Sequence, residues 1–173
     1  FDFIEITLGP DADSYSENFQ KRIKSALDGF EVLGHLHWGI DIFSQHGIEE
    51  VCSLIEFSKD LGVSKVTIHP QSDQELEKGE LLKNNIHSLS EIMRFCRKND
   101  IMLLVENTKK PPFNTPVAVE ELLSNIPGCL ATLDIGHALT VSSLAAFFNV
   151  LGDRIKHIHL HDVKGAGNDH LFF

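Results

Sequence analysis

Hydrophobic positions in this chain switch repeatedly between the two-residue period of a β-strand and the three-to-four-residue period of an α-helix. Short apolar runs typical of strands lie at residues 1–8, 31–37, 65–69, 101–106, 129–134 and 155–161. Longer segments with helical spacing separate them, at 16–29, 47–61, 80–98, 116–126 and 140–151. This strict alternation predicts an α/β fold with a parallel sheet and helices outside it.

The helical spacing also predicts which side chains face the core. The helix at 47–61 would bury Ile48, Val51, Leu54, Ile55 and Leu61, and Gly62 would end it. The helix at 16–29 would bury Phe19, Ile23, Ala26 and Leu27. His46 and His87 fall at the edges of predicted helices, and we interpret them as surface residues.

Five of the predicted strands end in His, Glu or Asp. The segments are VLGHLH (32–37), VTIHP (66–70), LLVEN (103–107), ATLDIGH (131–137) and KHIHLHD (156–162). One strand that stops in such a residue carries little information. Five consecutive strands that do so predict one shared polar site, and these are the side chains that bind divalent metals.

Side-chain alternation places these groups on one face of the sheet. In 155–161, His157, His159 and His161 share a face, whereas Ile158 and Leu160 lie on the other. The histidine face would point to the site, and the apolar face would pack on the outer helices.

Two architectures fit alternating strands and helices, an open doubly wound sheet and a (β/α)8 TIM barrel. The chain has no GxGxxG segment or P-loop, which are the usual phosphate-binding signatures of the open sheet. Polar ends on five neighbouring strands favour the barrel, because its active site lies at the carboxyl ends of the strands. A complete barrel has about 250 residues. We therefore predict that residues 1–173 form a single incomplete TIM-barrel domain that lacks the last two strands.

Composition limits the kinds of partner and cellular location that we expect for this chain. The formal net charge of −10 opposes binding to nucleic acid, because such binding relies on Lys and Arg neutralising phosphates. No apolar stretch approaches the roughly 20 residues of a membrane span, and no signal-peptide pattern is present. Cys52, Cys96 and Cys129 are widely spaced among apolar residues and read as core residues in a reducing compartment. We expect a cytoplasmic protein.

The mixture of imidazole and carboxylate groups suits Zn²⁺ or Mn²⁺ better than Mg²⁺, which prefers oxygen ligands and water. Asp134 and His137 would bring both ligand types into one tight loop after a strand. Gly136 between them would let the backbone turn there.

These residues also have purely structural interpretations. A histidine at a strand end is usually a hydrogen-bonded core or rim residue. Glu106 could pair with Lys109 or Lys110, and Asp134 could cap a helix. Trp38, the only tryptophan, could form a pocket wall that stacks on a substrate, or it could pack in the core.

At these residues the chain resembles the xylose isomerase-like barrel superfamily, which joins sugar-phosphate isomerases and epimerases with abasic-site nucleases of the endonuclease IV type. Val105-Glu106-Asn107-Thr108 is similar to the nuclease's I-E-N-T segment, the most specific single match. The other matching segments are His35–Asp41 (H-x-x-Y-x-I-N), His69-Pro70 (HPG), Asp134–Ala138 (D-T-C-H-A), His159–Lys164 (H-L-N-D-S-K) and His170-Leu171 (D-x-H). Asn168 stands where the last motif has Asp.

The resemblance implies a site for one to three divalent ions, Zn²⁺ or Mn²⁺. The implied metal ligands are His35, His69, Glu106, Asp134, His137, His159 and His170. The implied catalytic groups are Glu106 and His69, and the candidate substrate-binding residues are Trp38, His161 and Lys164.

Three functions remain open. The first is a metal-dependent sugar or sugar-phosphate isomerase or epimerase. In this enzyme Glu106, Asp134 and His159 would be the main ligands of the metal at the mouth of the barrel. The second is an endonuclease IV-like abasic-site nuclease, which the net charge disfavours. The third is a non-catalytic paralogue that binds metal or sugar. The favoured partner is a small-molecule sugar, and assembly into a homo-oligomer is compatible with the sequence.

Overall fold

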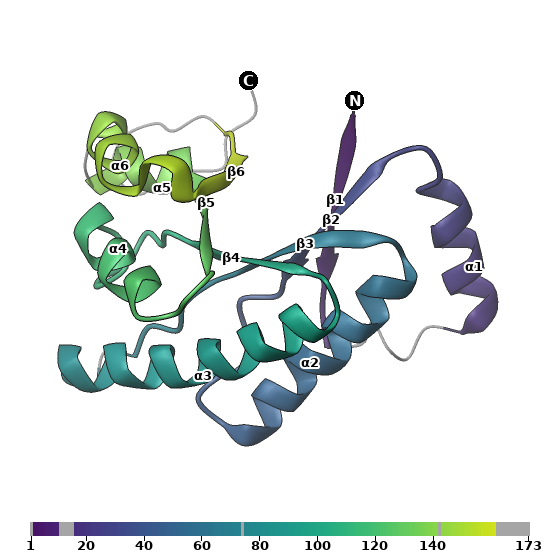
Figure 1. The fold of residues 1–173 in the computed structure, drawn as a ribbon, viewed down its shortest axis with the longest axis horizontal. Coiled ribbons are helices and arrows are strands. Elements are labelled where there is room, and N and C mark those ends of the chain that lie inside the picture. The colour runs from purple at the N-terminus through teal and green to yellow at the C-terminus, as the bar shows by residue number, and fades with distance from the viewer. Residues whose placement is uncertain (1, 11–15, 74, 142, 162–173) are drawn as a thin grey trace. The chain divides into compact units, whose positions relative to one another are not determined.

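The computed structural model describes residues 2–10, 16–73, 75–141 and 143–161 (Figure 1). The strands are β1 (Phe3–Leu8), β2 (Glu31–Leu36), β3 (Val63–Ile68), β4 (Met102–Glu106), β5 (Leu130–Asp134) and β6 (Ile155–His159). The helices are α1 (Glu17–Ala26), α2 (Gln45–Asp60), α3 (Lys78–Lys98), α4 (Pro116–Ser124), α5 (Ile135–Val141) and α6 (Leu144–Leu151), with a short 3₁₀ helix η2 (Gly152–Arg154). All strands lie where the apolar pattern predicts them.

The chain divides into two compact units. The first consists of Phe1–Ile68 with Ser88–Leu103, and the second of His69–His87 with Leu104–Phe173. In the first unit β1 pairs with β2 and β2 pairs with β3, all parallel, and the register aligns Thr7, His35 and Thr67. The parallel pairing confirms the α/β class.

Helix α2 packs against β2 and β3 in the first unit. Its first turn is capped by Ser44, whose hydroxyl accepts a hydrogen bond from the backbone N–H of Gly47 at 3.0 Å. Gly47 must be glycine, because a Cβ there would collide with the backbone carbonyl of Asp41. The predicted inward set of this helix is confirmed, since Ile48, Val51, Leu54, Ile55 and Leu61 are all buried.

The predicted burial of the first helix is wrong for most of its face. No residue of α1 is buried, and Phe19 is 43% exposed. Leu27, which follows the last turn, is buried. Spacing alone shows that a helix has an apolar side, but contact with another element is needed to cover that side.

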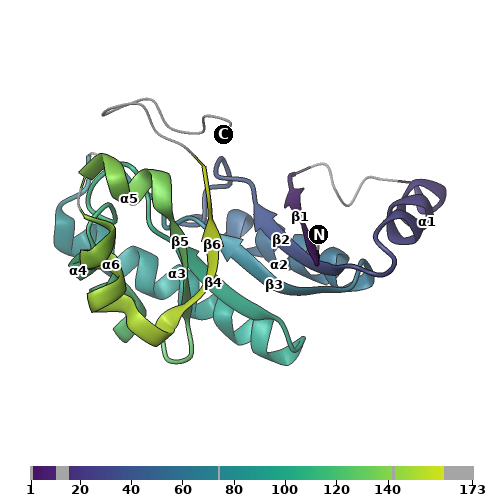
Figure 2. The ribbon, with the colours of Figure 1, turned by 90° about the horizontal axis from the view of Figure 1, so that it is seen from above.

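In the second unit β4 pairs with β5 and β5 pairs with β6, again in parallel (Figure 2). Helices α4 and α6 contact each other, and Phe113 and Phe147 are fully buried. The segment after β3 is tied to α3 by Asn85, whose side-chain amide bonds both the N–H and the carbonyl of Gln71. These two hydrogen bonds fix the backbone close to His69, at the carboxyl end of β3.

The helix predicted at 140–151 is two helices. Helix α5 begins at Ile135, directly after β5, and α6 begins at Leu144 with Ser143 as its cap. The predicted loop around Gly136 is therefore the first turn of α5. The helix starts this early because the Asp134 carboxylate accepts a hydrogen bond from the His137 backbone N–H at 2.7 Å.

The outer face of β6 also differs from the prediction. Ile158 and Leu160 are 42% and 64% exposed, rather than packed on helices. In the part of the chain that the structure describes, no helix follows β6 to cover them.

Within the described residues, no single helix is long and apolar enough to cross a membrane. The bent pair formed by α5 and α6 with η2 meets the length and composition criteria only when its two arms are taken together. Both arms contribute buried residues to the second unit, among them Ala138 and Phe147.

Candidate active site

Two carboxylates lie at the carboxyl ends of neighbouring strands of the second unit. Glu106 ends β4 and Asp134 ends β5, and each residue is only 1% exposed. Both strands carry almost continuous buried residues, as expected where both faces of a parallel strand are covered. Burial of two carboxylates is costly unless positive charge or hydrogen bonds compensate them.

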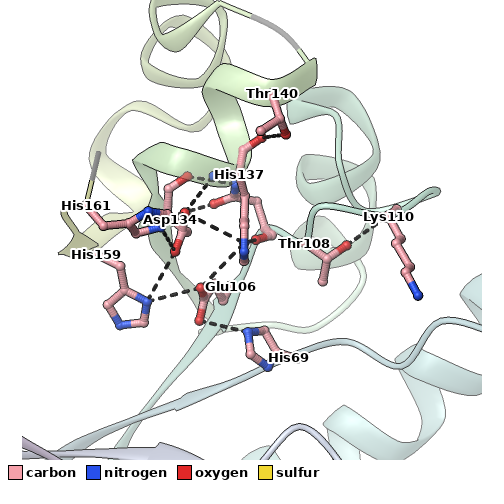
Figure 3. A network of polar contacts seen from close by, with 10 residues as sticks. His69, Glu106, Thr108, Lys110, Asp134, His137, Thr140, His159 and His161 are labelled. Carbon is pink, nitrogen blue, oxygen red and sulfur yellow. Dashed lines mark hydrogen bonds and ion pairs between the residues drawn. The ribbon is translucent and has the colours of Figure 1, made fainter. Parts of the chain in front are cut away.

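Histidines surround Glu106 (Figure 3). His69 Nε2 lies 3.1 Å from Glu106 Oε2, and His159 Nδ1 lies 3.0 Å from Glu106 Oε1. His137 Nδ1 is farther away, at 3.8 Å from Oε1. An ionised carboxylate only accepts hydrogen bonds, so the two nearer nitrogens carry hydrogen and donate. These contacts make Glu106 part of a cluster of imidazoles at the strand ends.

Asp134 is held from two sides. His161 Nε2 lies 2.9 Å from Oδ1 and 3.0 Å from Oδ2, and the backbone N–H of His137 donates to Oδ1. His159 Nδ1 is 3.9 Å from Oδ2. The helix-cap interpretation of Asp134 is thus confirmed, and it coexists with a place in the polar cluster, because the second oxygen faces other partners.

Asn107 links the two strand ends, and sequence reasoning assigned it no role. Its Oδ1 accepts from the Asp134 backbone N–H at 2.8 Å, and its Nδ2 donates to the Asp134 carbonyl at 3.0 Å. Its own carbonyl lies 3.0 Å from His137 Nδ1. The sequence offers one clue to its importance, since Asn107 directly follows Glu106 within the E-N-T segment. In the structure Asn107 is fully buried.

The donor set fits a divalent metal ion. Glu106, Asp134 and His137 each offer a ligand atom, and these three atoms lie within 4.8 Å of one another. The nitrogen of His137 that faces the two carboxylates is Nδ1, at 3.7 Å from Asp134 Oδ1 and 3.8 Å from Glu106 Oε1, and the same atom lies 3.0 Å from the Asn107 carbonyl oxygen. Mixed imidazole and carboxylate ligands suit Zn²⁺ or Mn²⁺. A cation here would also compensate the two buried carboxylates.

The remaining predicted site residues are distributed differently. His35 lies half-buried on β2 of the first unit. Trp38, in the same unit, is 77% exposed, so its alternative interpretation as a core residue is wrong. Its ring stacks on His37 with the centroids 5.3 Å apart. Lys164 and His170 lie outside the described residues.

The two surface histidines and two of the three cysteines follow the sequence interpretation. His46 and His87 are exposed, and Cys96 and Cys129 are buried, but Cys52 is only half-buried and its assignment to the core is wrong. Burial raises the pKa of the Cys129 thiol to about 12. Burial and the nearby Glu49 carboxylate raise the pKa of Cys52. Neither thiol is therefore activated as a nucleophile.

Known proteins resemble this chain in sequence and in fold. A family model described as "Xylose isomerase-like TIM barrel" matches residues 1–173. Over 137 residues the chain is 33% identical to uncharacterized protein MJ1311 of Methanocaldococcus jannaschii, covering 72% of this chain and 46% of that protein. The chain spans about half the length of the curated relatives it matches.

Solved structures share the fold. A D-tagatose 3-epimerase-like protein superposes with a TM-score of 0.82 at 27% identity, covering 98% of this chain and 71% of that one. D-psicose 3-epimerase from Clostridium cellulolyticum H10, solved with D-tagatose, has a TM-score of 0.78 at 15% identity, covering 92% and 62%. At 15% identity the second match speaks for the fold alone. The predicted TIM-barrel class is confirmed.

Proposed function

The chain belongs to the xylose isomerase-like TIM barrel family, and we propose that it is a divalent-metal-dependent isomerase or epimerase of a sugar or sugar phosphate. The observation that carries this proposal is the pair of buried carboxylates, Glu106 and Asp134, set among imidazoles at adjacent strand ends. The likeness to a D-tagatose 3-epimerase-like protein supports a sugar as substrate.

Glu106 and Asp134, with the imidazoles of His137 and His159, would hold the ion. A divalent ion bound there would polarise the substrate carbonyl and make the adjacent C–H more acidic. The carboxylates would also fix the ion against the strand ends, because both residues are buried at the ends of neighbouring strands.

Sugar epimerisation removes a proton from a carbon next to a carbonyl and returns it to the opposite face. His69 is placed for proton handling, since its Nε2 shares a hydrogen bond with Glu106 Oε2 at 3.1 Å. We propose that His69, through this contact, holds the Glu106 carboxylate in place while substrate is bound. Glu106 and His69 are thus the catalytic candidates in the described residues, alongside a base that another strand end would supply.

Substrate contacts remain part of the proposal. Trp38 exposes an indole face on which the apolar side of a sugar could stack, and it is the only tryptophan in the chain. Its fluorescence therefore reports on this residue alone. Addition of a ketose that binds the protein should change the emission of Trp38. A Trp38→Leu variant should raise KM more than it lowers kcat.

The deciding experiment assays the full-length protein, loaded with Mn²⁺, Co²⁺ or Zn²⁺, against a panel of ketoses, aldoses and their phosphates. We expect interconversion that a chelator abolishes and that a Glu106→Gln variant lacks. A protein that binds metal but converts no sugar in the panel would refute the proposal. A duplex with an abasic site serves as a parallel substrate, and its chelator-sensitive incision would replace the isomerase proposal with a nuclease.

A further inference from the structure

The contact between His161 and Asp134 differs from the other histidine contacts of the cluster. His161 Nε2 lies nearly equidistant from both carboxylate oxygens, at 2.9 and 3.0 Å. The side chain of His161 is 12% exposed, and that of Asp134 is 1% exposed. One N–H therefore contacts both carboxylate oxygens, in addition to the backbone N–H of His137 that donates to Oδ1 (Figure 3).

The space for the His161 ring is created by Gly136. A Cβ built on Gly136 would fall 2.6 Å from Nε2 of His161 and closer still to Cε1. Gly136 lies in the first turn of α5, and its φ is not positive. Nothing in its backbone conformation requires glycine, and in a helix alanine is normally the better residue. The glycine is therefore explained by the ring that covers it.

The direction of the hydrogen bond follows from the partners. The Asp134 carboxylate can only accept, so His161 donates from Nε2. Partners of this kind, which bind the ligands of a metal rather than the metal, orient those ligands and typically change metal affinity by about 10- to 100-fold. His137 N–H and His161 Nε2 together hold the Asp134 carboxylate in one orientation.

We infer that His161 is a positioning residue that orients the Asp134 carboxylate for metal binding, and that Gly136 is required only because the His161 ring occupies the space above it. This inference rests on the metal site of the proposed function. It assigns His161 an action through Asp134, and it gives residue 136 a role that depends on residue 161.

The first test measures binding of Mn²⁺ alone to the metal-stripped full-length protein, by calorimetry and by the electron paramagnetic resonance signal of free Mn²⁺. His161→Ala should weaken Mn²⁺ binding about 10- to 100-fold. His161→Gln should restore part of this loss, because its amide can donate to the carboxylate. His87→Ala, an exposed residue of α3, should leave Mn²⁺ affinity unchanged.

The second test is a double-mutant cycle. Gly136→Ala should weaken Mn²⁺ binding in the natural background, because the methyl group displaces the ring. In the His161→Ala background the same change should cause no further loss of affinity and should raise Tm, since the new methyl group has room and alanine favours the helix. Equal losses in both backgrounds would overturn the link between the two residues.

The outcomes separate this inference from the proposed function. If the natural protein does not bind Mn²⁺, the metal site of the proposed function fails. If it binds Mn²⁺ and His161→Ala lowers Tm without changing affinity, His161 is merely structural and the inference fails. If His161→Ala abolishes binding as completely as Glu106→Gln and glutamine gives no rescue, His161 is itself a ligand, which also overturns the inference.

Discussion

Replacing Asn107 should destabilise the second unit more than its single side chain suggests. Asn107 is fully buried, and its amide group exchanges two hydrogen bonds with the backbone of Asp134, at 2.8 and 3.0 Å. Asn107→Ala removes both partners and leaves a buried N–H and a buried carbonyl unsatisfied. Each unsatisfied group costs about 1–3 kcal/mol, so the free energy of unfolding should fall by roughly 2–6 kcal/mol.

The assay is equilibrium urea denaturation followed by far-ultraviolet circular dichroism. Asn125→Ala is the matched control, because Asn125 is exposed and its Nδ2 makes one hydrogen bond to the Glu121 carbonyl at 2.8 Å. That control should cost less than about 1 kcal/mol. If Asn107→Ala costs no more than Asn125→Ala, the reasoning from buried reciprocal hydrogen bonds is wrong.

Further predictions test other parts of the structure. Cys129 should resist iodoacetamide at pH 8 in the folded protein, whereas half-buried Cys52 should react slowly; rapid labelling of Cys129 would contradict its burial. Folding raises the pKa of the Cys129 thiol from 9.0 to about 12, so the folded state favours the protonated thiol. The free energy of unfolding should therefore fall as the pH rises above 9, and Cys129→Ala should reduce that fall. Trp38 fluorescence should have the red-shifted emission of an indole in water and be quenched efficiently by acrylamide; blue-shifted, protected emission would contradict its 77% exposure. Gly47→Ala should lower Tm, because the new Cβ would collide with the backbone of Asp41. Gly79→Ala should leave Tm unchanged or raise it, because the space there is open and alanine favours a helix. Equal Tm shifts of the two variants in thermal melts would refute this steric argument.

Much of the fold could be predicted from local pattern. The strand positions follow from short apolar runs, and parallel pairing follows from the helices between them. The outer contacts were less predictable. Phe19 and Leu160 belong to clear apolar patterns yet are exposed, because burial depends on whether another element covers that side.

The candidate site divides in the same way. Glu106 and Asp134 could be chosen from the sequence because each ends an apolar strand, and the carboxyl ends of parallel strands meet at one edge. The role of Asn107 could not be chosen, since its partner Asp134 lies 27 residues away and the pattern around it is that of an ordinary strand end.

The sequence by itself determined the alternation of strand and helix, and it placed carboxylates and imidazoles at the strand ends, because periodicity and burial are local properties of the chain. Only the tertiary structure decided that Asn107 joins β4 to β5 and that His161 lies over Gly136. Those contacts depend on close packing between segments that are distant in the chain, which no local pattern specifies.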